Sequence, residues 1–216
     1  MQKLPAGLVL IAWPDFLEPA ALAAFQAAAQ RLEPVERSYI PAHKQGGTVA
    51  YANLARQAPT IAAFYHSPGL QQKISTAVGC SLQPTPLRDQ SSLSLLIYDR
   101  PGDWIGWHLD HNFYRGRHFT LLIPLINRGS LASGLSHGEL RVQPSGQAER
   151  RIDTAPNQAV LFEGTQLLHQ VSPLHAGEQR VVLSMTFCTD SHATWLQGIA
   201  RRIKDTAFFG IRALWT

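Results

Sequence analysis

Three residues of this sequence could together hold a metal ion. His108 and Asp110 lie two positions apart in the run YDRPGDWIGWHLD (98–110), so on an extended strand their side chains leave the same face. A second imidazole must come from elsewhere in the fold, and His169, in LFEGTQLLHQV (161–171), is the best-placed candidate. Two histidines and one carboxylate on one face of an octahedron leave the opposite positions open to reactants.

This ligand set favours ferrous iron, although zinc, manganese or nickel could occupy the same ligands. The alternative for His108 and Asp110 is an ordinary polar pair at a strand end. Further histidines compete for the metal, namely His111, His118, His137, His175 and His192. On a strand, His111 would share the orientation of Leu109 and face away from the metal.

The elements that must position these residues are strands. After residue 90, eight short runs are rich in β-forming residues and bounded by Gly, Pro or Asn. They cover 92–99, 104–110, 118–126, 138–142, 150–154, 159–164, 168–173 and 180–188. Eight such runs predict two facing sheets in a barrel-like sandwich.

The amino-terminal part has a different pattern. GLVLIAW (7–13) predicts a short buried strand, and apolar residues at helical spacing over 18–32 predict a helix capped by Asp15. Two more helices are expected near 57–66 and 69–79, divided by Ser67-Pro68-Gly69. Residues 36–54, with a Gly-Gly pair in a polar stretch, read either as a lid over a site or as a connector.

The carboxy-terminal tail predicts a helix over about 193–214. Its apolar residues recur at helical spacing, and most of its charged residues fall on the other side. We expect this helix to pack on the protein itself or on a second subunit, as in a homodimer. The alternative is a basic amphipathic helix on a membrane surface, with Phe208, Phe209 and Trp215 as anchors.

Length and composition indicate a soluble globular protein. With 216 residues, 45% hydrophobic and 16% charged, the chain is most simply one domain over 1–216. No apolar run is long enough for a transmembrane helix, and two distant cysteines suggest no disulfide framework, so we expect a cytoplasmic location. The charge of +4 favours anionic partners, but without a lysine-rich run or helix-turn-helix signature we do not expect nucleic-acid binding.

An ordered set of residues over roughly 90–190 resembles the Fe(II)- and 2-oxoglutarate-dependent oxygenases, and within them the prolyl-4-hydroxylase-like branch. The set consists of Tyr98, Gly102, His108-Leu109-Asp110, Thr120, Gly138-Glu139-Leu140, PNQAVLFEG (156–164), His169 and Arg180. The resemblance implies an α+β fold. Its core would be a double-stranded β-helix of the jelly-roll, cupin-like kind over about 90–190, with helical support over 15–80 and a helix at the carboxy terminus.

The resemblance also assigns roles. It implies that His108, Asp110 and His169 are the iron ligands and that Arg180 anchors the distal carboxylate of 2-oxoglutarate, because a guanidinium pairs two carboxylate oxygens at once. Tyr98 and Thr120 are candidates for hydroxyl contacts to the same carboxylate. Three weaker candidates for substrate contact are Trp104, Arg115 and Arg117; core packing for Trp104 and solvated loop charges for Arg115 and Arg117 are the alternatives.

The implied reaction is hydroxylation of an unactivated C–H bond with release of succinate and carbon dioxide. Its cofactors would be Fe(II), 2-oxoglutarate and O2, with ascorbate as a candidate supporting reductant. An ionised Asp110 takes the position that a halide would need, which favours hydroxylation over halogenation. The substrate is either a peptidyl residue, an amino acid or another small molecule. A non-enzymatic cupin-like metal-binding barrel and a nucleic-acid dealkylating oxygenase are the rival functions.

Overall fold

The computed structural model describes residues 9–33, 35–41 and 43–192. The strands in this part of the chain are β1 (Leu10–Trp13), β2 (Glu36–Ile40), β3 (Lys44–Val49), β4 (Gln83–Pro84), β5 (Leu93–Tyr98), β6 (Trp104–His108), β7 (His118–Arg128), β8 (Leu140–Gln143), β9 (Arg150–Ile152), β10 (Ala159–Phe162), β11 (Leu168–Val171) and β12 (Gln179–Cys188). The helices are α1 (Pro19–Ala29), α2 (Tyr51–Gln57), α3 (Pro59–Tyr65) and α4 (Pro68–Val78).

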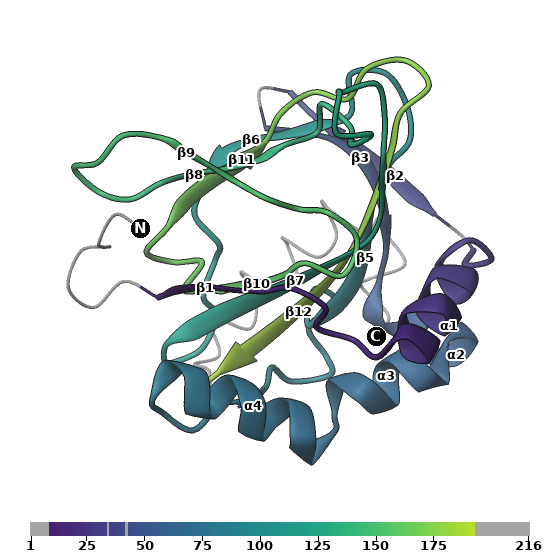
Figure 1. The fold of residues 1–216 in the computed structure, drawn as a ribbon. Coiled ribbons are helices and arrows are strands. Elements are labelled where there is room, and N and C mark those ends of the chain that lie inside the picture. The colour runs from purple at the N-terminus through teal and green to yellow at the C-terminus, as the bar shows by residue number, and fades with distance from the viewer. Residues whose placement is uncertain (1–8, 34, 42, 193–216) are drawn as a thin grey trace.

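The described strands form one sheet that folds over on itself. Their order is β1-β10-β7-β12-β5-β3-β6-β11-β8-β9, with β2 added to β3 and β4 to β12. Figure 1 shows β6, β11, β8 and β9 lying opposite β10, β7, β12 and β5, with the four helices beneath the latter group. All eight strands predicted after residue 90 are present, and the predicted jelly-roll, cupin-like core is confirmed.

Strand alternation divides the interior into two regions. On β12, Val181, Leu183, Met185 and Phe187 belong to a buried cluster shared with the helices, while alternate residues such as Arg180 face the space between the two halves of the sheet. Side chains of successive residues on a strand point to opposite faces. The same strand therefore holds the helices on one face and furnishes a cavity on the other.

The stretch 36–54 is neither a lid nor a plain connector. It forms the β2–β3 hairpin, and β3 lies between β5 and β6 in the sheet. Its glycines allow this close packing: a Cβ at Gly46 would lie 3.4 Å from the Ile97 carbonyl oxygen, and one at Gly47 would lie 2.7 Å from Val35 Cγ1. The Gly-Gly pair that suggested a loop thus serves the approach of two strands.

The amino-terminal elements largely match the prediction. Strand β1 and helices α1, α3 and α4 lie within or beside the predicted ranges, but α1 is shorter than 18–32. The expected Asp15 cap is wrong, because Glu18 is the N-cap residue and makes no side-chain capping bond, while Asp15 lies in a turn with a φ of 49°.

Two sequence-based expectations concern membranes and the tail. The predicted helix over 193–214, and with it the homodimer contact, lies outside the described residues. Within the described ranges, none of the helices has the length and apolar character needed to cross a bilayer.

Candidate metal centre

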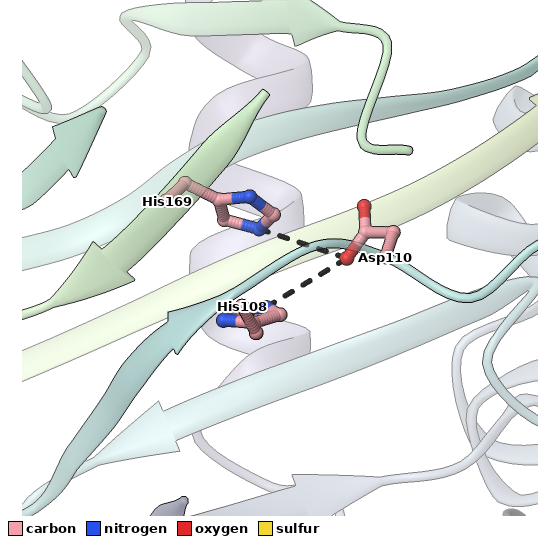
Figure 2. Close-up of side chains that lie close together, drawn as sticks. All are labelled: His108, Asp110 and His169. Atoms are coloured by element: carbon pink, nitrogen blue, oxygen red, sulfur yellow. Dashed lines mark ion pairs between the residues drawn. The ribbon is translucent and has the colours of Figure 1, made fainter. Parts of the chain in front are cut away.

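The structure brings His108, Asp110 and His169 together at the open edge between the two halves of the sheet. His108 ends β6, Asp110 follows it by two residues, and His169 lies on β11 directly opposite His108. The Nε2 atoms of His108 and His169 lie 3.7 and 3.6 Å from Asp110 Oδ1. Figure 2 shows both rings directed toward this one carboxylate. One ligand atom from each residue falls within 4.8 Å of the others.

Backbone contacts set the tautomer of both rings. His108 Nδ1 lies 2.8 Å from the Gly106 carbonyl oxygen, and His169 Nδ1 lies 2.9 Å from that of Leu167. A carbonyl oxygen can only accept, so each Nδ1 carries the proton and donates it. In a neutral imidazole the lone pair is then on Nε2, the atom that faces Asp110. This arrangement fits metal ligation, in which the outer ring nitrogen usually donates to a carbonyl or carboxylate.

The carboxylate of Asp110 is held on its other side. The Thr120 hydroxyl donates to Asp110 Oδ2 at 2.6 Å, and the Asp110 N–H donates to the Gly164 carbonyl at 2.9 Å. These bonds leave Oδ1 facing the two imidazoles. Thr120 is thus placed as an orienting partner of Asp110, and its predicted contact with 2-oxoglutarate stays a prediction.

Gly164 is a site residue whose role the sequence did not reveal. A Cβ built on Gly164 would lie 1.9 Å from Asp110 Oδ2 and 2.6 Å from its Cγ. No side chain fits there unless Asp110 moves, so only glycine is compatible with this carboxylate position. Gly164 ends the run PNQAVLFEG (156–164). The sequence marks this run as part of a motif but does not show that Gly164 contacts Asp110.

Electrostatics favours the protonation states that a metal requires. Burial, and to a lesser degree the neighbouring His169, lower the pKa of His108 to about 4. Burial raises the pKa of Asp110, but His169, His108 and His118 outweigh that effect and the net pKa of the carboxyl lies below its usual range. A neutral imidazole and an ionised carboxylate at neutral pH are the metal-binding forms of these groups.

The three residues open into a cavity of about 160 Å³ that also contains Arg180. The Arg180 side chain is only 1% exposed, and within the described part of the chain its Nε and Nη2 have no hydrogen-bond partner. Burial lowers its pKa. A desolvated guanidinium with unused donors is costly unless a bound anion accepts from it. The inner end of the cavity is therefore built for an anion.

Tyr98 lies beside this arginine. The two residues are direct partners on β5 and β12, and the guanidinium carbon of Arg180 lies 5.4 Å from the Tyr98 ring centre. The ring supports the cation through its face. Both side chains line the cavity, so the structure keeps Tyr98 as a candidate for contact with the same anion.

A β-bulge separates Trp104 from the cavity. His169 pairs with His108, but Val171 pairs with Ile105. Between these two pairs β6 advances three residues while β11 advances two, so β6 contains one extra residue. Ile105 and His108 consequently both line the cavity, whereas Trp104 does not. Trp104, a weak candidate for substrate contact, is therefore not among the residues that line the cavity. Trp107, the residue before His108, is 37% exposed and does not line the cavity.

The two loop arginines do not line the cavity. Arg117 forms a two-pronged ion pair with Glu163, with Nη2 to Oε2 at 2.6 Å, and its guanidinium carbon lies 4.8 Å from the Phe119 ring centre. Arg115 is exposed. The alternative of loop charges fits both residues better than substrate contact, because the cavity is bordered by other side chains.

Some cavity residues were missed or placed differently by sequence reasoning. His43 and Lys44 come from the β2–β3 hairpin that was expected to be a loop, and His43 packs against His108 with ring centres 5.7 Å apart. His111, expected to face away from the metal, is exposed and borders the cavity. His118 is buried and also lines the cavity. Only the strand pairing of β3 with β6 could have revealed the first two.

A second group of possible ligands, His137, His175 and Glu178, is already satisfied internally. Glu178 accepts from the backbone N–H groups of Ser130, His137 and His175, from the Ser130 hydroxyl and from His137 Nδ1 at 2.7 Å. These bonds lower the pKa of Glu178 despite its burial. The carboxylate organises loops rather than presenting free oxygens to an ion.

Several solved structures share the fold of this chain. The chain is similar to an oxidoreductase of the 2OG-Fe(II) oxygenase family from Burkholderia pseudomallei (17% identity, 88% of this chain and 89% of that chain, TM-score 0.69). It is also similar to a Pseudomonas putida prolyl-4-hydroxylase (18%, 85% and 93%, 0.56) and to the non-heme alpha-ketoglutarate-dependent epimerase SnoN from nogalamycin biosynthesis (14%, 83% and 76%, 0.67).

These similarities define the class of the fold. It is that of the Fe(II)- and 2-oxoglutarate-dependent oxygenases, and the predicted likeness to the prolyl-4-hydroxylase-like branch is confirmed. Within that class, a family model described as Halogenase D matches residues 15–206, so the chain belongs to the Halogenase D family. None of the curated proteins compared with this chain is significantly similar to it.

The contact between Gly164 and Asp110 gives a first prediction. Gly164→Ala should displace the Asp110 carboxylate and weaken Fe(II) binding at least tenfold, because the added methyl group overlaps Oδ2. Anaerobic calorimetric titration of Fe(II) measures this. Gly69→Ala is the matched control, since a Cβ at Gly69 in α4 meets nothing within 4 Å. Equal Fe(II) affinity in both variants would show that the site tolerates a shifted Asp110.

Proposed function

We propose that this protein is an Fe(II)- and 2-oxoglutarate-dependent dioxygenase that hydroxylates an unactivated C–H bond and releases succinate and carbon dioxide. The observation that carries the proposal is the joint presence, in one cavity, of a His-Asp-His set and a buried arginine with unused donors. The His-Asp-His set suits Fe(II), and the buried arginine suits a carboxylate of 2-oxoglutarate. The test is 2-oxoglutarate consumption and succinate release across a panel of peptides, amino acids and other small molecules.

The protein side chains have separate tasks. His108, Asp110 and His169 would hold Fe(II), which supplies the oxidising power for C–H cleavage when it is bound with 2-oxoglutarate and O2. Arg180 would pair the distal carboxylate of 2-oxoglutarate through its two unused nitrogens, with Tyr98 against the guanidinium face. Thr120 and Gly164 keep the Asp110 carboxylate in place. Ascorbate would serve only to keep iron reduced.

Asp110 supports hydroxylation even though the family description is Halogenase D. Its Oδ1 lies within 3.7 Å of both imidazole Nε2 atoms, so the third protein ligand is present in this chain. A halide would need that coordination position. Halogenation remains the second candidate function because of the family description, and the carboxylate is the specific observation against it.

Two rival functions are distinguishable by turnover. A non-enzymatic metal-binding barrel would bind iron without consuming 2-oxoglutarate. A nucleic-acid dealkylating oxygenase would consume 2-oxoglutarate in the presence of alkylated nucleic acid. Such an enzyme would be expected to have a second arginine several residues after the first on the same strand, and the residues of β12 after Arg180 include none. Peptide and small-molecule substrates both stay within the proposal, since a prolyl-4-hydroxylase and an epimerase share this fold.

The role of Arg180 predicts the behaviour of its variants. Arg180→Ala should weaken 2-oxoglutarate binding by an amount on the order of 2–5 kcal/mol, because a buried charge pair is lost. Arg180→Lys should restore only part of the affinity, since an ammonium cannot reproduce the planar fork. Calorimetry on the Fe(II) protein under nitrogen measures both. Arg115→Ala, which changes an exposed arginine outside the cavity, is the control; an unchanged 2-oxoglutarate affinity in Arg180→Ala would refute the assignment.

The role of Asp110 predicts the product. The wild-type protein should form hydroxylated product only, and saturating bromide should not alter its rate, because the carboxylate occupies the halide position. Halide dependence should appear in Asp110→Gly, which opens the position, and not in Asp110→Asn, which keeps it filled. Mass spectrometry distinguishes hydroxylated from halogenated product in each of the three proteins. Halogen incorporation by the wild type would contradict this interpretation of Asp110.

A further inference from the structure

Two hydroxyl groups on the cavity wall are not used by the protein itself. Most of the hydroxyl side chains there bond to a carboxylate, a carbonyl or another hydroxyl at 2.6 to 3.2 Å. These bonds hold Thr48, Ser91, Thr120 and Thr186. Apart from the Tyr98 phenol beside Arg180, the exceptions within the described ranges are Ser94 and Ser184, whose hydroxyls have no protein partner there.

These two serines form a pair. Ser94 on β5 and Ser184 on β12 lie directly opposite each other in the antiparallel ladder, and both line the cavity. Directly opposed residues have Cβ atoms about 5 Å apart on the same face, so one ligand group can reach both hydroxyls. Ser94 is 3% exposed and Ser184 is 8% exposed. A buried hydroxyl without a protein partner lowers stability unless a ligand bonds to it.

Successive cross-strand pairs on β5 and β12 divide this wall of the cavity into layers. In order, the layers are Tyr98–Arg180, Leu96–Val182 and Ser94–Ser184. Alternate residues of a strand lie about 7 Å apart, so the serine layer is two such steps from the arginine layer. The next cavity residue on β12, Thr186, pairs with Thr120, whose hydroxyl holds Asp110. The serine pair is therefore adjacent to the layer that supports the metal centre.

The row of residues across the sheet at this layer is uncharged. Ser184 pairs on its other side with Leu122 of β7, which in turn pairs with Val160 of β10. A fully charged group placed here would lose hydration without an opposite charge in the row. A hydroxyl or a carboxamide can both donate and accept, as the serine hydroxyls can. The row therefore suits an uncharged polar group, with Leu122 beside it for an aliphatic segment.

We propose, on the basis of the proposed function, that Ser94 and Ser184 bind an uncharged polar group of the primary substrate. This group is a hydroxyl or a carboxamide next to an aliphatic segment. Both ends of 2-oxoglutarate are charged, and Arg180 and the metal are their proposed partners. The neutral serine pair is then left for the substrate, and its place beside the metal centre brings the neighbouring C–H bonds of the substrate toward the iron.

The test compares four probes with the same chain of five carbons: pentan-1-ol, pentanamide, pentanoate and pentylammonium. Each is titrated under nitrogen into protein saturated with Fe(II) and 2-oxoglutarate. Broadening of the probe's proton NMR signals by the paramagnetic ion reports both affinity and proximity to the metal. The wild type should bind at least one neutral probe roughly tenfold more tightly than either charged probe. Which neutral probe binds more tightly separates hydroxyl from carboxamide recognition.

Variants separate a binding role from a structural one. Ser94→Ala and Ser184→Ala should each weaken the preferred neutral probe about three- to tenfold, the effect of one net hydrogen bond. Their affinities for Fe(II) and 2-oxoglutarate should not change, and their melting temperatures should not fall, because no protein hydrogen bond is lost. Ser92→Ala is the matched control and should leave probe binding unchanged. Ser92 is also buried with an unpartnered hydroxyl among the described residues, but it does not line the cavity.

Four results would overturn the proposal. The first two concern the wild type: no binding of either neutral probe, or no preference for a neutral probe over the charged ones. The other two concern the double variant Ser94→Ala, Ser184→Ala: unchanged affinity for the neutral probe, or a loss of 2-oxoglutarate affinity, which would assign the pair to the co-substrate. In each case normal Fe(II) and 2-oxoglutarate binding by the wild type would leave the proposed function standing. A wild type that binds neither Fe(II) nor 2-oxoglutarate would instead remove the proposed function together with this inference.

Discussion

The antiparallel register that sets His169 opposite His108 is the interaction on which the site depends. It brings two imidazoles from residues sixty-one positions apart to a ring-centre distance of 4.1 Å. Carbonyls two residues before each histidine fix the tautomers. The third ligand, Asp110, lies just after β6. The Thr120 hydroxyl holds its carboxylate, and Gly164 leaves the space for it. A shift of one residue would turn the rings to opposite faces.

Buried positive charge is the second organising feature. The fold buries the Arg180 guanidinium with two of its nitrogens unpartnered among the described residues, which lowers stability unless an anion binds. The cation is thus in place before the ligand binds, so little reorganisation is needed on binding. The helices and their apolar cluster on the other face of the sheet provide the stability that this requires.

The strands and the metal-ligand candidates could be predicted because their signals are local. Short β-rich runs between Gly, Pro and Asn mark β5 to β12, and the His108–Asp110 spacing follows from strand alternation. The hairpin at 36–54 could not, because Gly46 and Gly47 look like loop residues until a neighbouring strand is present. The candidate substrate contact of Trp104 could not be judged from the sequence, because it depends on a bulge that only the pairing of β6 with β11 reveals. Gly164 owes its importance to a contact with Asp110 that no spacing reveals.

The central claim is that His108, Asp110 and His169 bind one ferrous ion, and the most direct test is an anaerobic Fe(II) titration of three proteins. The wild type and His175→Ala should each bind one equivalent, because His175 belongs to the group around Glu178 whose oxygens are already engaged. His169→Ala should lose stoichiometric binding. Retention of a full equivalent by His169→Ala, with its loss in His175→Ala, would contradict the account and move the metal to the other histidine pair.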